Sequence, residues 1–253
     1  ILQKMGYLAP RTKMVSVYFN SKNYEMIFQE KASKEFLEFN NHRESAIIES
    51  DEYIFWKLRA ANEKSIKINN KKLSFNGIIF PKLLNKNFFD KGSSHEYISL
   101  KGLNHFSDAI LESWHVGGDY KETSFSDSIL SNGNIKRQKI LSKFKLLLIS
   151  MGADHGLLNH NRRFYFDAIN NSFIPIYYDG NSQIRKLKKL NQENLNLIKK
   201  RRLINEIDVI HLDILINELI DDLKNIDINE LNNSLNENGI KINNKETYLI
   251  KEN

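Results

Sequence analysis

An alternation of apolar and polar residues marks the first strand predicted in the chain. It runs through residues 13–20 (KMVSVYFN), and the polar residues SKN then lead into a second predicted strand over 24–31 (YEMIFQEK). Alternation is typical of half-buried strands, and a short polar segment between two such strands is typical of a hairpin turn. The pattern therefore predicts a β-hairpin, followed by a short helix over 33–44 for which Ser33 is a candidate N-cap.

Apolar residues recur at helical spacing farther along the chain. Residues 45–58 are typical of a strand that runs into a helix, whereas 65–80 are polar and strand-like, as in a surface excursion, and 117–128 predict a loop. Helices are predicted over 99–115, over 131–152 with Gly152 as terminator, and over 186 to about 235. This mixture predicts an α+β protein, with a small N-terminal sheet region and a larger, mostly helical C-terminal part.

Composition narrows the classes of function. The 253 residues carry a formal charge of +6 and contain no cysteine. Disulfides, thiolate metal sites and cysteine nucleophiles are therefore excluded, although the absence of cysteine does not fix the compartment. The positive charge suits an anionic ligand such as a nucleotide. No apolar run approaches the roughly 18 residues of a membrane span, so we expect none.

Two further features concern the partners and the extent of the chain. The basic run KKRR (199–202) lies among interleaved charges typical of a solvated helix face. Because no base-reading motif accompanies it, nucleic-acid binding is a weaker alternative. The chain opens on Ile1 in what reads as the middle of a helix, so we expect the natural protein to be longer upstream.

The chemistry gathers between Asp154 and Asn181 (DHGLLNHNRRFYFDAINNSFIPIYYDGN). Two strands joined by the turn INNS would form a hairpin whose outer ends lie on one edge, which would bring Asp154 and Asp179 together. Phosphoryl-transfer enzymes of the kinase type need such an arrangement, with one Asp on the acceptor hydroxyl and an Asn and a second Asp on the metal ions. Kinase-type Asp-x4-Asn spacing selects Asn159, and Asn161 competes for the same role. A hairpin with solvated polar ends is the structural alternative.

The chain resembles the CotH kinase family, the relatives of spore coat protein H. The resemblance rests on Asp154, His160-Asn161 before the aromatic strand, and Ile174-Pro175 and Tyr178 before Asp179, with LAPRTKMVSVYFN and YEMIFQEKASKEFLE upstream in family order. It covers roughly residues 1–185 as an N-terminally incomplete catalytic region. Residues 186–253 would be a helical extension packed on the same domain.

The resemblance implies an atypical protein-kinase-like fold and an enzyme that uses ATP with Mg or Mn to phosphorylate proteins, for example a coat or surface protein. It also implies that Asp154 is catalytic and that Asp179 binds metal with Asn161, which we prefer to Asn159. Many members have Trp-Asp-x-Asp where this chain has Tyr-Asp-Gly-Asn, so Asn181 replaces a possible carboxylate.

Phosphoryl transfer also needs a cation on the phosphates that a carboxylate holds in place. Lys31 is the candidate cation, with Glu30 or Glu49 as its partner, and Arg43 is a rival. The chain has no Gly-rich phosphate loop, because the turn FNSKNYEM lacks glycine. Asn181 and the lack of an obvious Lys–Glu pair motivate a second hypothesis, that of a kinase-shaped structural or binding module without catalysis.

Overall fold

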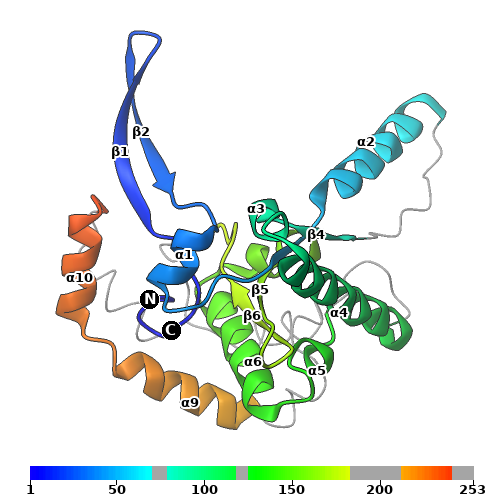
Figure 1. Cartoon of the computed structure of the whole chain (residues 1–253). Coiled ribbons are helices and arrows are strands. Elements are labelled where there is room, and N and C mark those ends of the chain that lie inside the picture. The colour runs from blue at the N-terminus through cyan, green and yellow to red at the C-terminus, as the bar shows by residue number, and fades with distance from the viewer. Residues whose placement is uncertain (70–78, 118–124, 183–211, 241–253) are drawn as a thin grey trace.

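The computed structural model describes residues 1–69, 79–117, 125–182 and 212–240. These residues form two antiparallel sheets and eight α-helices, which confirms the α+β class (Figure 1). The strands are β1 (Thr12–Phe19), β2 (Lys22–Gln29), β3 (Ile47–Ser50), β4 (Pro81–Leu83), β5 (Arg163–Asp167) and β6 (Ser172–Ile176). The helices are α1 (Lys34–Phe39), α2 (Glu52–Asn69), α3 (Lys86–Phe89), α4 (Ser93–Gly117), α5 (Asp127–Leu130), α6 (Ile135–Ser150), α9 (Leu212–Lys224) and α10 (Ile228–Glu237).

The predicted N-terminal hairpin is present as β1 and β2, which pair in continuous register from Thr12↔Gln29 to Phe19↔Lys22. Its turn consists of two residues, Asn20 and Ser21, with φ of 48° and 58°. Positive φ at both central positions is the backbone of a type I′ turn, whose twist matches that of the two strands. The hairpin forms an arm that extends away from the rest of the molecule (Figure 1).

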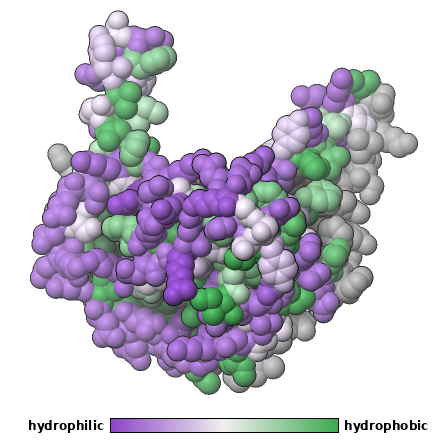
Figure 2. Space-filling view, viewed as in Figure 1, coloured by the Kyte–Doolittle hydropathy of each residue, from purple (hydrophilic) through white to green (hydrophobic). Residues whose placement is uncertain are grey.

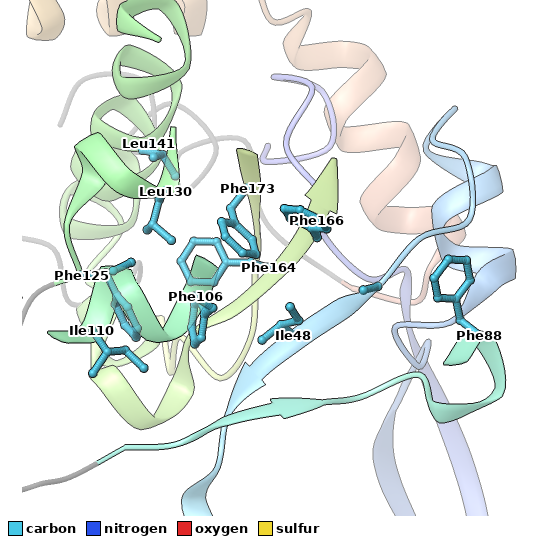
Figure 3. Packing of buried hydrophobic residues seen from close by; sticks show 12 residues of the cluster. Ile48, Phe88, Phe106, Ile110, Phe125, Leu130, Leu141, Phe164, Phe166 and Phe173 are labelled. Atoms are coloured by element: carbon cyan, nitrogen blue, oxygen red, sulfur yellow. The ribbon is translucent and has the colours of Figure 1, made fainter. Parts of the chain in front are cut away.

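The second sheet has the order β4-β3-β5-β6 and separates two layers of core. Side chains alternate along β5, so Phe164 and Phe166 lie on one face and Tyr165 on the other. The first face packs against α4, α5 and α6, and Figure 3 shows its aromatic cluster around Phe106 and Phe173. The second face is covered by α1 and by the N-terminal segment, with the buried side chains of Leu8, Ala32, Phe36, Leu37, Ile47 and Ile176.

Helix α4 approaches the sheet closely at Gly102. A Cβ atom at this position would lie 2.9 Å from Cδ1 of Ile48 and 2.9 Å from Cδ1 of Phe166. Real Cβ contacts are longer than this, so a glycine here permits the close packing of helix on sheet. Leu103 and Ile110 of the same helix pack in this layer, as the predicted periodicity implies.

Two expectations for the connecting segments are wrong in part. Residues 65–69 are helical, because α2 continues through Lys-, Glu- and Ala-rich sequence that favours helix. Residues 127–130 of the expected loop form α5, whose N-cap Ser126 accepts a hydrogen bond from Ile129 N at 3.4 Å. The remainder of the two segments, 70–78 and 118–124, lies outside the described residues.

The C-terminal helix α9 packs against α6. Lys143 of α6 forms ion pairs with Glu218 at 3.1 Å and with Asp222 at 2.8 Å, and Leu219 is buried against α6. Helical structure is therefore confirmed for 212–224 and 228–237, whereas the basic run at 199–202 lies outside the described residues. Within the described part of the chain, no helix combines the length and the apolar character that crossing a membrane requires.

Candidate functional site

The segment that contains Asp154 is oriented by the end of α6. Gly152 has a φ of 59°, and the amides of Gly152 and Ala153 donate to the carbonyls of Ile149 at 3.0 Å and Leu148 at 2.7 Å. This pair of bonds is a Schellman motif, which ends a helix and turns the chain sharply. The 3-10 helices η1 (Asp154–Leu157) and η2 (Asn159–Asn161) follow at once and lead into β5.

The residues around Asp154 and Asp179 meet in space, as the hairpin between them predicted. Nδ1 of His155 lies 2.8 Å from the carbonyl oxygen of Asp179 and 3.4 Å from its Oδ2. The Ser182 hydroxyl also donates to the carbonyl of Met151, which precedes Asp154 in the chain, at 2.9 Å. The segment after β6 therefore lies along the start of η1, and the residue adjacent to Asp154 contacts Asp179 directly.

Gly156 makes this approach possible. A Cβ atom on Gly156 would lie 2.8 Å from the carbonyl oxygen of Tyr178 and 3.2 Å from Cα of Gly180. Both neighbours are backbone atoms, which cannot rotate away as a side chain would. A side chain at Gly156 would therefore push the two segments apart.

The backbone at Asp179 is held in an unusual conformation. Asp179 and Asn181 have φ of 43° and 46°, on either side of Gly180. Left-handed backbone is uncommon outside glycine and is found more often at Asn and Asp than at other residues. Gly180 is itself buried against the ring of Tyr177, where a Cβ would lie 2.5 Å from the Tyr177 hydroxyl oxygen. Surrounding contacts that hold non-glycine residues in such a conformation are often found at functional sites.

Asn161 joins the same assembly, and Asn159 begins the helix that carries it. The Asn161 side chain is 2% exposed, and its Nδ2 donates to the carbonyl oxygen of His155 at 2.9 Å and lies 3.0 Å from His155 Nδ1. When Nδ1 carries a proton it donates to Asp179, and when it is bare it accepts from Asn161. His155 thus links the Asn and the Asp for which the sequence predicted a shared metal role.

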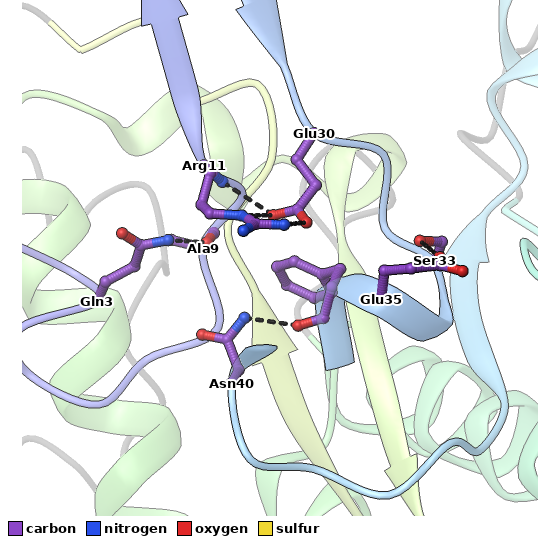
Figure 4. Close-up of polar contacts among 8 residues, drawn as sticks. Gln3, Ala9, Arg11, Glu30, Ser33, Glu35 and Asn40 are labelled. Carbon is purple, nitrogen blue, oxygen red and sulfur yellow. Dashed lines mark hydrogen bonds and ion pairs between the residues drawn. The ribbon is translucent and has the colours of Figure 1, made fainter. Parts of the chain in front are cut away.

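The residues predicted for nucleotide binding are distributed over two places. Glu30 accepts from Arg11, whose Nε lies 3.0 Å from Glu30 Oε2 at the base of the arm (Figure 4). Lys31 is exposed and forms no ion pair with another described residue. Arg43 is exposed too, and its charge acts on Tyr165 on the α1 side of the sheet. The predicted pairing of Lys31 with Glu30 or Glu49 is therefore replaced by other ion pairs.

Glu49 pairs with two cations that the sequence had not singled out as its partners. Arg163 Nε donates to Glu49 Oε2 at 2.9 Å, and Lys82 Nζ lies 3.4 Å from Glu49 Oε1. The Arg163 guanidinium also lies 3.3 Å from the ring centroid of Tyr178, the residue before Asp179. A cation held by a carboxylate therefore lies beside the Asp179 segment.

Arg162 and Arg163 stand at the start of the strand predicted at RRFYFDA, and because successive side chains of a strand point to opposite faces, the sequence predicts that one faces the site and the other solvent. Arg163 is the one near the site, but Arg162 points into the core, where its guanidinium lies over the rings of Phe125 at 5.4 Å and Phe164 at 5.0 Å. Burial lowers the pKa of Arg162 to about 10. The expectation that the second arginine is solvated is therefore wrong, because that face of β5 is covered by α4 and α5.

Comparisons of the chain with protein-family models, with curated proteins and with solved structures find no match. Among the described residues, no three His, Cys, Asp or Glu side chains cluster as metal ligands. The site is therefore defined by its own geometry: two loops in contact through His155, a buried Asn161, and the Arg163–Glu49 pair.

Proposed function

We propose that this chain is an ATP- and divalent-metal-dependent phosphotransferase of the atypical protein-kinase type that acts on protein hydroxyl groups. The observation that carries the proposal is the contact of His155 with both Asp179 and Asn161. It joins the segment of Asp154 to the segment of Asp179 across the β5–β6 hairpin. Kinase-type phosphoryl transfer needs a catalytic aspartate and two metal ligands in this order along the chain.

The donor set fits Mg or Mn. Carboxylate and amide oxygens are the protein ligands that these hard cations prefer, and water completes their coordination. Asp179 offers a carboxylate that is about half exposed. The hydrogen bonds of Asn161 to His155 use its amide nitrogen. The Asn161 atom that would bind a cation is therefore Oδ1. A bound metal would neutralise charge on the phosphates of the nucleotide.

Each side chain then has a role of its own. Asp154 orients the acceptor hydroxyl and accepts its proton, and Asn161 and Asp179 hold the metal. Arg163, oriented by Glu49 through its Nε, keeps its outer guanidinium nitrogens for a phosphate. Lys82 is the second cation on Glu49, with its Nζ 3.4 Å from Oε1. Lys31 and Arg43 stay predicted alternatives for the phosphate-binding cation.

The experiment is phosphate transfer from labelled ATP to a generic protein acceptor with Mg or Mn, comparing wild type, Asp154→Asn and Asp179→Ala. Positioning and charge neutralisation provide most of the catalysis in such reactions. We therefore expect each substitution to remove at least about 99% of the transfer, on the scale of one lost charge-stabilising group. Equal incorporation by the three proteins would refute the assignment. Lys13→Ala, a change on the arm, is the control for handling and concentration.

A second candidate is a nucleotide-independent structural or binding module with this fold. It is favoured by Asn181, which stands where many members of the CotH kinase family have a carboxylate. Thermal unfolding with ATP at millimolar concentration, with and without Mg or Mn, separates the two candidates. The phosphotransferase should gain stability only when nucleotide and metal are present together, whereas the module should show no shift.

A further inference from the structure

The outer edge of β2 carries backbone hydrogen-bonding groups that no other described strand uses. Hydrogen bonding alternates along an antiparallel pair, and the amide of Glu30 donates to the carbonyl of Arg11 at 2.9 Å. By this alternation the backbone groups of Met14 and Ile27, which are opposite one another, point away from the hairpin. The amide of Met14 indeed donates outward, to the carbonyl of Asn238 at 3.0 Å. On β2 the outward-facing residues are Asn23, Glu25, Ile27 and Gln29.

No other described strand pairs with the β1–β2 sheet. All eight residues of β2 are exposed, and a hairpin of two strands is at best marginally stable in water. Natural proteins protect such an edge with proline, with bulges or with several charges. Of the residues in β2, only Lys22 and Glu25 are charged and none is proline. Among the described residues, nothing that pairs with this edge is present, so the edge can accept a further strand.

The arm also has one apolar face. Residues directly opposite in the register share a face, which places six apolar side chains together between Lys13 at the base and Lys22 at the tip. Four of these six are large and 45–67% exposed, and hydrophobic side chains are visible along the arm in Figure 2. The six residues are Val15, Val17, Phe19, Tyr24, Met26 and Phe28.

The sequence of β2 is complementary to itself in an antiparallel register. Only outward-facing residues can exchange hydrogen bonds across a new strand pair, so the residue numbers of opposed partners must sum to an even number. A sum of 50 would place Glu25 opposite Glu25 of the second copy, and directly opposed like charges are destabilising. A sum of 52 pairs Asn23 with Gln29 and Glu25 with Ile27 through hydrogen bonds, and opposes Tyr24 to Phe28.

We propose that two copies of this chain pair through their β2 strands, antiparallel, with the two-fold axis beside Met26. Met26 then lies opposite Met26 of the second copy, and each Tyr24 forms an aromatic cross-strand pair with Phe28. Lys22 of each copy lies opposite Glu30 of the other. The result is a four-stranded sheet in the order β1-β2-β2-β1, in which the apolar faces of the two arms are continuous.

The pairing is an isologous contact and closes on itself, so it gives dimers and no filament. It involves eight residues of β2 on each side, against the about 20–30 residues a side of a stable interface. The dimer should therefore form and dissociate with concentration. An assay that traps it covalently is the sharpest test, and the chain is suited to one because it has no cysteine.

The first test compares Met26→Cys with Ile27→Cys under mild oxidation, followed on non-reducing gels. Cys at position 26 faces its own copy at a separation that a disulfide can span. At position 27 the two sulfurs are offset diagonally, at about 7–8 Å between Cα atoms, which a disulfide does not bridge. We expect the Met26→Cys dimer to form faster than the Ile27→Cys dimer, and the difference to vanish in urea. Equal rates in the folded proteins would overturn the proposal.

The second test changes the backbone of the edge. Proline at Ile27 removes one outward amide and leaves the ladder with β1 intact. Ile27→Pro should lower the dimer fraction in sedimentation equilibrium of the whole chain, whereas Ile27→Val should not. An unchanged dimer fraction in Ile27→Pro would refute strand pairing. A chain that stays monomeric at all concentrations would refute it too. So would equal cross-linking of cysteines placed at 24, 26 and 28, because that result indicates face-to-face packing of the arms.

Discussion

Replacement of Asp127 and replacement of its partner Lys145 should have unequal effects on stability. The two side chains form an ion pair in the core, with exposures of 7% and 3%. Arg162, also buried, lies within electrostatic range of Asp127, and its Nη2 has no hydrogen-bond partner among the described residues. The group therefore contains two buried cations and one buried anion.

Asp127→Asn leaves both cations without a countercharge, the situation that costs about 3–5 kcal/mol in buried pairs. Lys145→Met leaves Asp127 with Arg162 as the remaining partner. The cost should therefore stay below about 3 kcal/mol, the lower end for an uncompensated buried charge. Asp127→Asn should accordingly be the more damaging change, although each substitution breaks the same ion pair.

The measurement is equilibrium urea unfolding of the two variants, followed by far-ultraviolet circular dichroism. Lys139→Met is the matched control: its side chain lies on the same helix α6, is 47% exposed and pairs with Glu218. An exposed pair of this kind should contribute no more than about 1 kcal/mol. If Lys145→Met costs as much as Asp127→Asn, Arg162 does not compensate Asp127 and the reasoning fails.

Three further predictions concern the site, the hairpin turn of β5 and β6, and the arm. Gly156→Ala should destabilise the protein by about 1–3 kcal/mol, because its Cβ would lie 2.8 Å from the Tyr178 carbonyl oxygen. Urea unfolding measures this loss. An unchanged urea midpoint would mean that the Asp154 and Asp179 segments separate freely. Hydrogen bonds from Asn170 and from Arg137 lower the pKa of Asp167 below its ordinary value of 3.8 even though burial opposes this. This carboxylate therefore stabilises the folded state above pH 3.8, and that contribution is lost as the pH falls below it. Asn170→Ala should reduce the difference in thermal midpoint between neutral and acid pH, and an unchanged difference would exclude the role of Asn170. Ser21→Gly should strengthen the arm by about 0.5–1 kcal/mol, since Ser21 has a positive φ; slower amide exchange in β1 and β2 would confirm it, and faster exchange would contradict it.

The local elements of this fold could be predicted because their signals are local. The hairpin was predicted from alternation and a polar turn, and its observed bounds differ from the prediction by one or two residues at each end. The predicted strand at RRFYFDA is β5. The return strand β6 ends at Ile176, so residues 177–180 (YYDG) belong to the segment that forms the site. Ser33 is the residue before α1, but it makes no side-chain cap bond and donates instead to Glu35 at 2.6 Å.

The candidate site was predictable only in part, because its second half depends on pairing across the sheet. That the segments of Asp154 and Asp179 meet follows from the hairpin between them, which the sequence predicts. The pairing of Glu49 with Arg163 does not follow, because the two residues are 114 positions apart. They meet because β3 pairs with β5 and places Glu49 opposite Arg163. Periodicity predicts that both strands exist but says nothing about which strands are neighbours.

The sequence alone favours Lys31 as the phosphate cation because it shows only proximity along the chain. In protein kinases the cation and its carboxylate lie on nearby N-terminal elements, and Lys31 beside Glu30 satisfied that expectation by proximity in the chain. In the structure Glu30 is committed to Arg11 at the base of the arm, and the cation beside Asp179 comes from β5 itself. If the chain transfers phosphate, Glu49 is then a carboxylate of the N-terminal half that orients a cation of the catalytic segment. This geometry predicts that Arg163→Ala loses activity while Lys31→Ala keeps full activity. The sequence pattern predicts that Lys31→Ala loses activity while Arg163→Ala keeps it.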